Sequence, residues 1–147
     1  MEPYIHKVHY YETDKMGIVH HSNYIRWMEE ARVDFLEKIG IGFPMMEERG
    51  IFSPVTGVEC RYRRPTRFDE QIRVTVRVES FNGIRLRITY EMHNREDALV
   101  ATGASEHCFT DASGRPMSLK KTHPDVDAVL TARISEEKNV DTSAKVC

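Results

Sequence analysis

One helical segment of broadly apolar character, from about residue 22 or 23 to residue 39, constrains the fold of this chain most strongly. Apolar side chains recur there every three and four positions, which places them on one face of an α-helix. These residues are Tyr24, Trp27, Met28, Ala31 and Phe35. Further apolar residues widen the face, so we expect the rest of the chain to enclose much of the helix. Gly40 and Gly42 mark its end.

Five segments have the composition or alternation of β-strands: residues 5–11, 55–63, 71–79, 84–92 and 98–110. Strict alternation in the third and fourth is typical of strands with one buried face, and Asn82-Gly83 between them predicts a tight hairpin turn. The order of strand, helix and four strands predicts an α+β fold in which an antiparallel sheet curls around one long helix. We expect a connection at residues 40–54, a short helix at about residues 125–134 and a frayed final dozen residues.

Size and charge narrow the possible functions. The 147 residues suffice for one domain with a proper core, and a formal net charge of −2 gives no sign of a nucleic-acid partner. No apolar run approaches the roughly 20 residues that span a membrane, and the N-terminus lacks a signal-peptide pattern. The three cysteines lack the spacing of metal ligands. We therefore expect a reduced, cytoplasmic location.

Asp14 precedes a glycine-containing turn and, about seven residues later, the start of the long helix. A helix start exposes backbone N–H groups without intrahelical partners and carries partial positive charge. A carboxylate folded back beside these groups would combine a nucleophile or base with an oxyanion acceptor, as acyl transfer requires. Gly17 lets the backbone pass closely, and Val19 can exclude water. The alternative is that Asp14 only caps the turn, as most loop aspartates do.

Histidines near Asp14 raise the question of a metal. His20 and His21 are adjacent, so their side chains diverge and joint chelation is awkward. His6, His9 and Asp14 could still join one of them in space to form a zinc site. Because no recognised spacing of metal ligands occurs, we predict no metal and no cofactor. A histidine here could instead orient a substrate, shuttle a proton or cap the helix.

Aromatic and basic residues supply further candidates. Tyr24 is close enough to the helix start to line a pocket, whereas Trp27 is expected in the core. Four arginines occur within seven positions: Arg61, Arg63, Arg64 and Arg67. They could form a solvated strand end, a clamp for the phosphates of a nucleotide-bearing ligand, or a nucleic-acid patch, which the slightly acidic chain disfavours. Neither a glycine-rich phosphate loop nor a GxSxG motif is present.

Residues 10–32, YYETDKMGIVHHSNYIRWMEEAR, resemble the signature of hot-dog-fold acyl-CoA thioesterases of the 4-hydroxybenzoyl-CoA thioesterase type. The similarity is greatest to the bacterial branch associated with the Tol–Pal system. Seven residues match the signature: Tyr11, Thr13, Asp14, Gly17, Val19, His21 and Tyr24. The resemblance covers residues 4–118 of a single domain, 1–147, and leaves the C-terminal tail at 119–147 uncovered.

The resemblance implies a hot-dog fold, with a five-stranded antiparallel sheet around the central helix. It implies hydrolysis of an acyl-CoA thioester to the free acid and CoA, with Asp14 as nucleophile or general base and the His21 backbone N–H polarising the carbonyl. The family often has an aromatic residue where this chain has His20, so the substrate shape or the pH dependence could differ. The substrate-binding residues it suggests are Gly17, Val19, His20, Tyr24, Arg61, Arg63 and Arg64.

The resemblance also implies a homodimer with the active site between subunits, and dimers of this family often form homotetramers. Two other functions remain open for the sequence. One is a hot-dog hydratase or dehydratase, and the other is a non-catalytic module that binds acyl-CoA. The chain length or aromaticity of the acyl group does not follow from the sequence.

Overall fold

The computed structural model of the chain describes the backbone of residues 1–141 and the side chains of residues 1–134. Its five strands are β1 (Tyr4–Lys7), β2 (Val55–Tyr62), β3 (Gln71–Phe81), β4 (Arg85–His93) and β5 (Leu99–Cys108). They form one sheet in the order β1-β3-β4-β5-β2, and every neighbouring pair is antiparallel. The helices are α1 (Ser22–Lys38), α2 (Phe43–Glu48), α3 (Leu119–Thr122) and α4 (Pro124–Asp141). The α+β prediction is confirmed.

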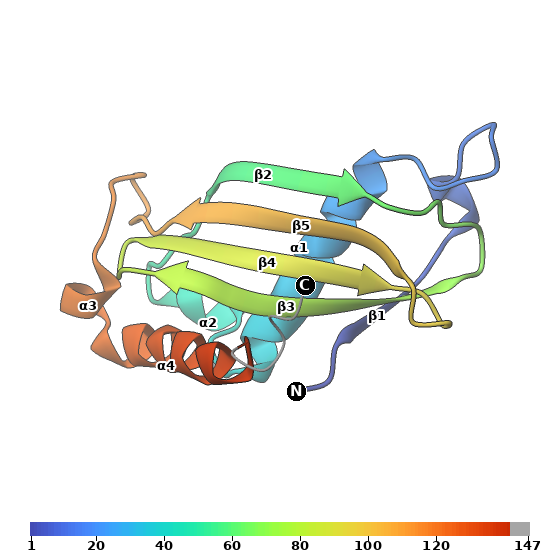
Figure 1. Cartoon of the computed structure of the whole chain (residues 1–147). Coiled ribbons are helices and arrows are strands. Elements are labelled where there is room, and N and C mark those ends of the chain that lie inside the picture. Colours follow the sequence, from blue (N-terminus) through green and yellow to red (C-terminus); the bar gives the residue numbers. More distant parts are fainter. Residues whose placement is uncertain (142–147) are drawn as a thin grey trace.

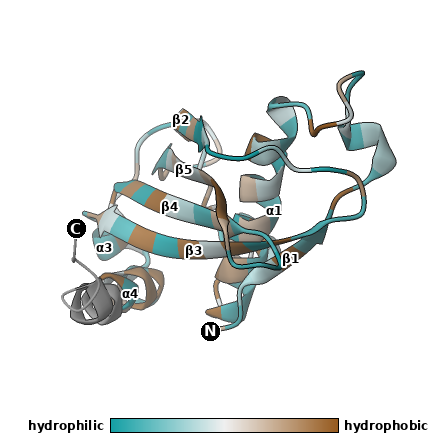
Figure 2. Ribbon diagram, turned by 45° about the vertical axis from the view of Figure 1, so that its right-hand side comes forward, coloured by the Kyte–Doolittle hydropathy of each residue, from teal (hydrophilic) through white to brown (hydrophobic). Residues whose placement is uncertain are grey.

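The sheet curls over one side of α1 (Figure 1). Figure 2 shows hydrophobic and hydrophilic residues alternating along β3 and β4. The apolar members of this alternation are buried in the core: Ile72, Val74, Val78, Leu86, Ile88, Tyr90 and Met92. Trp27, Met28 and Ala31 meet them from α1 and are at most 1% exposed. The far side of α1 is less enclosed than expected, since Ile25 and Val33 are exposed.

The first strand is shorter than predicted, because it ends at Lys7 and a 3₁₀ turn follows at Tyr10–Glu12. A polar contact, rather than the β-propensity of the residues, ends the strand here. The Glu12 carboxylate accepts the His9 backbone N–H at 2.7 Å, which closes the turn. This turn directs the chain away from the sheet and toward the start of α1.

Two helices differ from the expectation. The connection expected at residues 40–54 contains α2, with Pro44 in its first turn. The C-terminal helix runs through Asp141, so residues 136–141, which were expected to be frayed, are helical; residues 142–147 lie outside the described part. Val126 and Leu130 anchor α4 in the core, with 1% and 0% exposure. Of the helices described here, none has the length and apolar character needed to cross a membrane.

Candidate active site

Asp14 begins a tight reversal of the chain between the 3₁₀ turn and α1. Its backbone N–H donates to the Ile18 carbonyl at 2.9 Å, and its carbonyl accepts the Gly17 N–H at 2.9 Å. Thr13 and Val19 form an antiparallel bridge at the base of this reversal. Gly17 has a φ of +77°, a left-handed conformation that favours glycine. Gly17 therefore lets the chain close this turn.

The carboxylate of Asp14 is held by one of its two oxygens. Oδ1 accepts the Met16 backbone N–H at 2.8 Å, which is the turn-capping role considered for this residue. Oδ2 accepts no hydrogen bond from the residues that the structure describes. The side chain is half-buried. Capping therefore fixes the orientation of Asp14 and leaves one oxygen available for chemistry.

The start of α1 is tied to the rest of the fold by backbone hydrogen bonds. The Val19 N–H donates to the Thr66 carbonyl and the His20 N–H to the Glu12 carbonyl, both at 2.8 Å. The next N–H group, that of His21, donates to no acceptor within the described chain. It lies at the N-cap of α1, where the helix dipole adds positive charge. This N–H is therefore available to an external acceptor.

Asp14 and His21 line one cleft with a volume of about 410 Å³. Its walls are largely apolar where the loop and α1 meet the end of β2. The residues that line the cleft are Asp14, Met16, Ile18, Val19, His21, Tyr24, Tyr62, Arg63, Arg64 and Pro65. A carboxylate with a free oxygen and a helix start with a free N–H thus share one small volume.

Tyr24 lines the cleft from the first turn of α1. Its hydroxyl forms a hydrogen bond with the Thr66 hydroxyl at 2.7 Å, and burial raises its pKa. Trp27, one turn further on, is in the core as expected.

Tyr62, a cleft residue that the sequence analysis did not select, supports the helix start. Its hydroxyl donates to the His21 carbonyl at 3.0 Å, and its ring lies edge-on to that of Tyr24, with centroids 5.0 Å apart. Burial raises the pKa of Tyr62 to about 12, so the hydroxyl stays a neutral donor near pH 7. The only sequence signal for this role is the alternation that places Tyr62 on the same face of β2 as Val58 and Cys60.

Three predicted substrate-binding residues do not line the cleft. Gly17 shapes the turn, and the His20 ring forms a hydrogen bond with the Ser22 hydroxyl at 2.8 Å. Arg61 lies opposite Thr102 on the other face of β2, because side chains alternate along a strand. Arg63 and Arg64 follow the end of β2 and do line the cleft, so the arginine cluster is divided between two surfaces.

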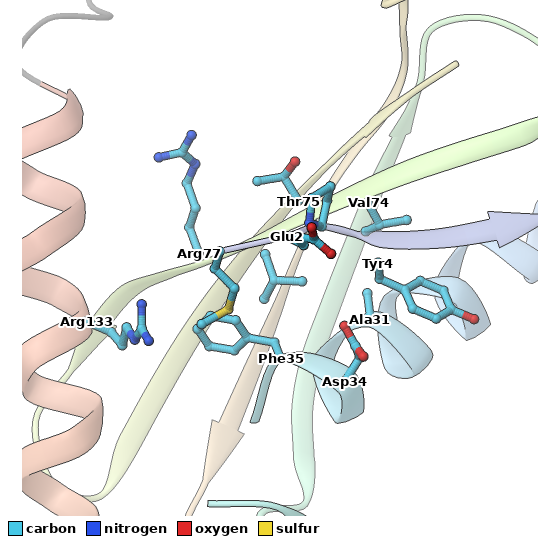
Figure 3. A pocket seen from close by; sticks show the side chains of 12 residues that line it. Glu2, Tyr4, Ala31, Asp34, Phe35, Val74, Thr75, Arg77 and Arg133 are labelled. Atoms are coloured by element: carbon cyan, nitrogen blue, oxygen red, sulfur yellow. The ribbon is translucent and has the colours of Figure 1, made fainter. Parts of the chain in front are cut away.

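A second cavity, of about 260 Å³, lies between β1, β3, α1 and α4 (Figure 3). Figure 3 shows Arg133 extending from α4 toward the Phe35 ring, and 6.0 Å separates the guanidinium carbon from the ring centroid. Glu2 and Asp34 also line this cavity. None of the site residues predicted from the sequence is among its lining residues.

Comparisons with known proteins identify the family of the chain. The family model described as the thioesterase-like superfamily matches residues 8–137. The candidate acyl-CoA thioesterase YneP of Bacillus subtilis (strain 168) is 34% identical over 120 residues, which cover 81% of this chain and 87% of that protein. A 1,4-dihydroxy-2-naphthoyl-CoA hydrolase of Thermosynechococcus vestitus is 27% identical over 108 residues, covering 73% and 74%.

Among solved structures, a DHNA-CoA thioesterase from Staphylococcus aureus superposes with a TM-score of 0.86 and 30% identity. The match covers 99% of this chain and 96% of that chain. The family match also reaches residue 137, within the C-terminal segment that the sequence signature left uncovered.

Proposed function

The chain belongs to the thioesterase-like superfamily and is a thioester hydrolase, and from this premise we propose that it hydrolyses acyl-CoA in the cleft between Asp14 and His21. The observation that carries the proposal is the shared cleft itself. A half-buried carboxylate with one free oxygen lies in it together with an unpaired N–H at the start of α1. Acyl transfer needs both groups at one carbonyl.

In the proposed mechanism the thioester carbonyl oxygen accepts the His21 N–H. The positive end of α1 stabilises the negative charge that develops on this oxygen as the carbonyl carbon becomes tetrahedral. Asp14 then acts in one of two ways. Its Oδ2 attacks the carbon and the C–S bond breaks, giving a mixed anhydride that water hydrolyses; or Oδ2 takes a proton from a water that attacks directly. Both routes release the free acid and the thiol of CoA.

The lining of the cleft supports this substrate class. Ile18, Val19 and Tyr24 offer an apolar wall for an acyl group. Arg63 and Arg64 bring two guanidinium groups to the same cleft, and guanidinium groups bind phosphates through paired hydrogen bonds. We propose that these two arginines contact CoA phosphates. Arg61, on the other face of β2, does not line this cleft.

We also propose the finer assignment from the signature, the 4-hydroxybenzoyl-CoA thioesterase type and its Tol–Pal branch. A substrate panel tests the type. It contains 4-hydroxybenzoyl-CoA, 1,4-dihydroxy-2-naphthoyl-CoA, and a short and a long aliphatic acyl-CoA. A preference for 4-hydroxybenzoyl-CoA supports the type, whereas a strong preference for another member argues against it.

The exposed edge of the sheet favours a homodimer, with a homotetramer built from two dimers as the next assembly. β2 pairs only with β5 and forms one edge. On the face directed toward α1, Val58 is 45% and Tyr62 47% exposed. A second copy of the chain would cover this edge and these side chains. Because Tyr62 also lines the Asp14 cleft, the same contact would close the active site. A monomer by light scattering would contradict this part of the proposal.

Asp14→Asn is the direct test of the site. The variant keeps the size of the side chain and an acceptor for the Met16 N–H, so it should fold and melt like the wild type. We expect thiol release from acyl-CoA to fall by roughly 100-fold or more, because the nucleophile or base is lost.

The matched control is Asp69→Asn, an exposed loop position in a left-handed conformation that asparagine tolerates well. It should hydrolyse acyl-CoA at the wild-type rate. Unchanged turnover in Asp14→Asn would remove Asp14 from the mechanism.

A further inference from the structure

A second cluster of chemically active side chains lies on the first strand and the turn that follows it. His6, His9 and Glu12 bring their ligand atoms within 4.8 Å of one another. His6 and Glu12 are each 4% exposed, while His9 is exposed. None of the three lines the Asp14 cleft. In the zinc site considered from the sequence, Asp14 was the carboxylate beside these histidines; the 3₁₀ turn places Glu12 there instead.

Glu12 is held as an ionised acceptor. Its Oε1 accepts the His9 backbone N–H and its Oε2 accepts the indole N–H of Trp27, both at 2.7 Å. A buried carboxylate of this kind is a strong ligand for a cation.

The His6 ring lies between two carboxylates. Its Nε2 is 2.9 Å from Glu12 Oε1, and its Nδ1 is 3.4 Å from Glu30 Oε2, an oxygen that also accepts the Tyr4 hydroxyl. A neutral imidazole has one N–H and can donate to only one of them. When Nδ1–H faces Glu30, the Nε2 lone pair faces Glu12, and a cation between these two atoms removes the repulsion. A carboxylate behind a histidine is also the usual support of a metal-ligating imidazole.

We propose that His6, His9 and Glu12 bind one divalent transition-metal ion of the Zn²⁺ class. Two imidazole nitrogens and one carboxylate oxygen form a ligand set typical of Zn²⁺, and the exposed side of His9 leaves a position for water. The ion takes no part in hydrolysis, because its ligands lie outside the cleft. The start of α1 is held without the ion, because the Glu12 carbonyl already accepts both the His20 N–H and the Asn23 side-chain amide.

Trp27 is a built-in reporter for this site, because it is the only tryptophan of the chain. Its indole N–H donates to Glu12, and its ring lies 4.6 Å from that of His6. The experiment titrates the purified full chain with Zn²⁺ and, separately, with Co²⁺, whose unpaired electrons quench nearby fluorescence. We expect one ion per chain by equilibrium dialysis and a change in Trp27 emission that saturates at the same metal concentration.

Two variants identify the ligands. His9→Ala removes an exposed ligand without disturbing the core, and we expect binding to weaken by at least ~10-fold. His20→Ala breaks the adjacent histidine pair, the other place where a metal could associate, and should leave the titration unchanged. No stoichiometric binding by the wild type would overturn the proposal, as would binding that His20→Ala abolishes and His9→Ala leaves unchanged. Thiol release by Asp14→Asn is measured separately, so the two proposals fail independently.

Discussion

Acidification from pH 7.5 to pH 5 should destabilise the folded chain by about 2 kcal/mol through one buried histidine, His107. This side chain, 2% exposed, ends a line of hydrogen bonds through the core. Arg32 donates to the Tyr90 hydroxyl at 3.1 Å, and 2.7 Å separates that oxygen from the Ser105 hydroxyl. Ser105 lies 2.8 Å from His107 Nε2, and His107 Nδ1 lies 3.3 Å from the Ser53 carbonyl. Because the Ser53 carbonyl can only accept, a neutral His107 carries its proton on Nδ1, and Nε2 accepts the Ser105 hydroxyl.

The magnitude follows from the pKa. Burial, with the charge of Arg32 as a second cause, lowers the pKa of His107 from 6.5 to about 4. The unfolded chain binds a proton below pH 6.5, whereas the folded chain binds it only near pH 4, so protons favour unfolding in this window. Each pKa unit corresponds to about 1.4 kcal/mol of the free energy of unfolding. The shift therefore removes about 3 kcal/mol of stability in total, and about 2 kcal/mol of this is lost by pH 5.

Urea unfolding between pH 7.5 and pH 5 measures this effect in the wild type and in His107→Gln. The variant is less stable at every pH, but it lacks the titrating group. On acidification, the free energy of unfolding of the variant should therefore fall by about 2 kcal/mol less than that of the wild type. In NMR spectra the His107 ring protons should keep their chemical shifts down to pH 5. Equal pH dependence in the two proteins, or a His107 resonance that titrates near pH 6.5, would refute the reasoning.

Three further outcomes are expected for thioester hydrolysis. Tyr62→Phe loses the hydrogen bond that holds the helix start, so kcat should fall severalfold, whereas Tyr10→Phe, a change at a side chain 77% exposed, should have no effect. The double variant Arg63→Ala/Arg64→Ala should raise KM for acyl-CoA, more at low salt than at high salt, while the exposed Arg115→Ala should not. A chelator should leave the rate unchanged, because the groups proposed to react are a carboxylate and a backbone N–H.

Much of the fold could be predicted because its signals are local. The three- and four-residue spacing along α1 and the alternation along β3 and β4 each arise within one element, and burial follows them closely. The pairing of Asp14 with the helix start was also accessible, because only a short reversal closed by Gly17 separates them. Helix α2 was missed because the glycines and prolines of residues 40–54 mark turns as readily as helix ends.

Contacts between distant segments could not be predicted in this way. Tyr62 reaches the His21 carbonyl from 41 positions along the chain, and the choice between Arg61 and Arg63 as a cleft residue depends on where β2 ends. The C-terminal helix was expected to end near residue 134 because the final dozen residues are polar, yet it runs through Asp141, and Val126 and Leu130 pack it against the core.

The sequence by itself determined the α+β layout, the buried faces of α1, β3 and β4, and the nearness of Asp14 to the amino end of α1, because periodicity and short chain separation govern these features. Only the tertiary structure decided which oxygen of Asp14 is free, that Tyr62 holds the start of α1, that Glu12 lies beside His6 and His9, and that the Ser53 carbonyl fixes the proton of His107. The physical reason is that each of these depends on a hydrogen bond whose partner is chosen by packing in three dimensions, where a change of a few ångströms replaces one acceptor by another.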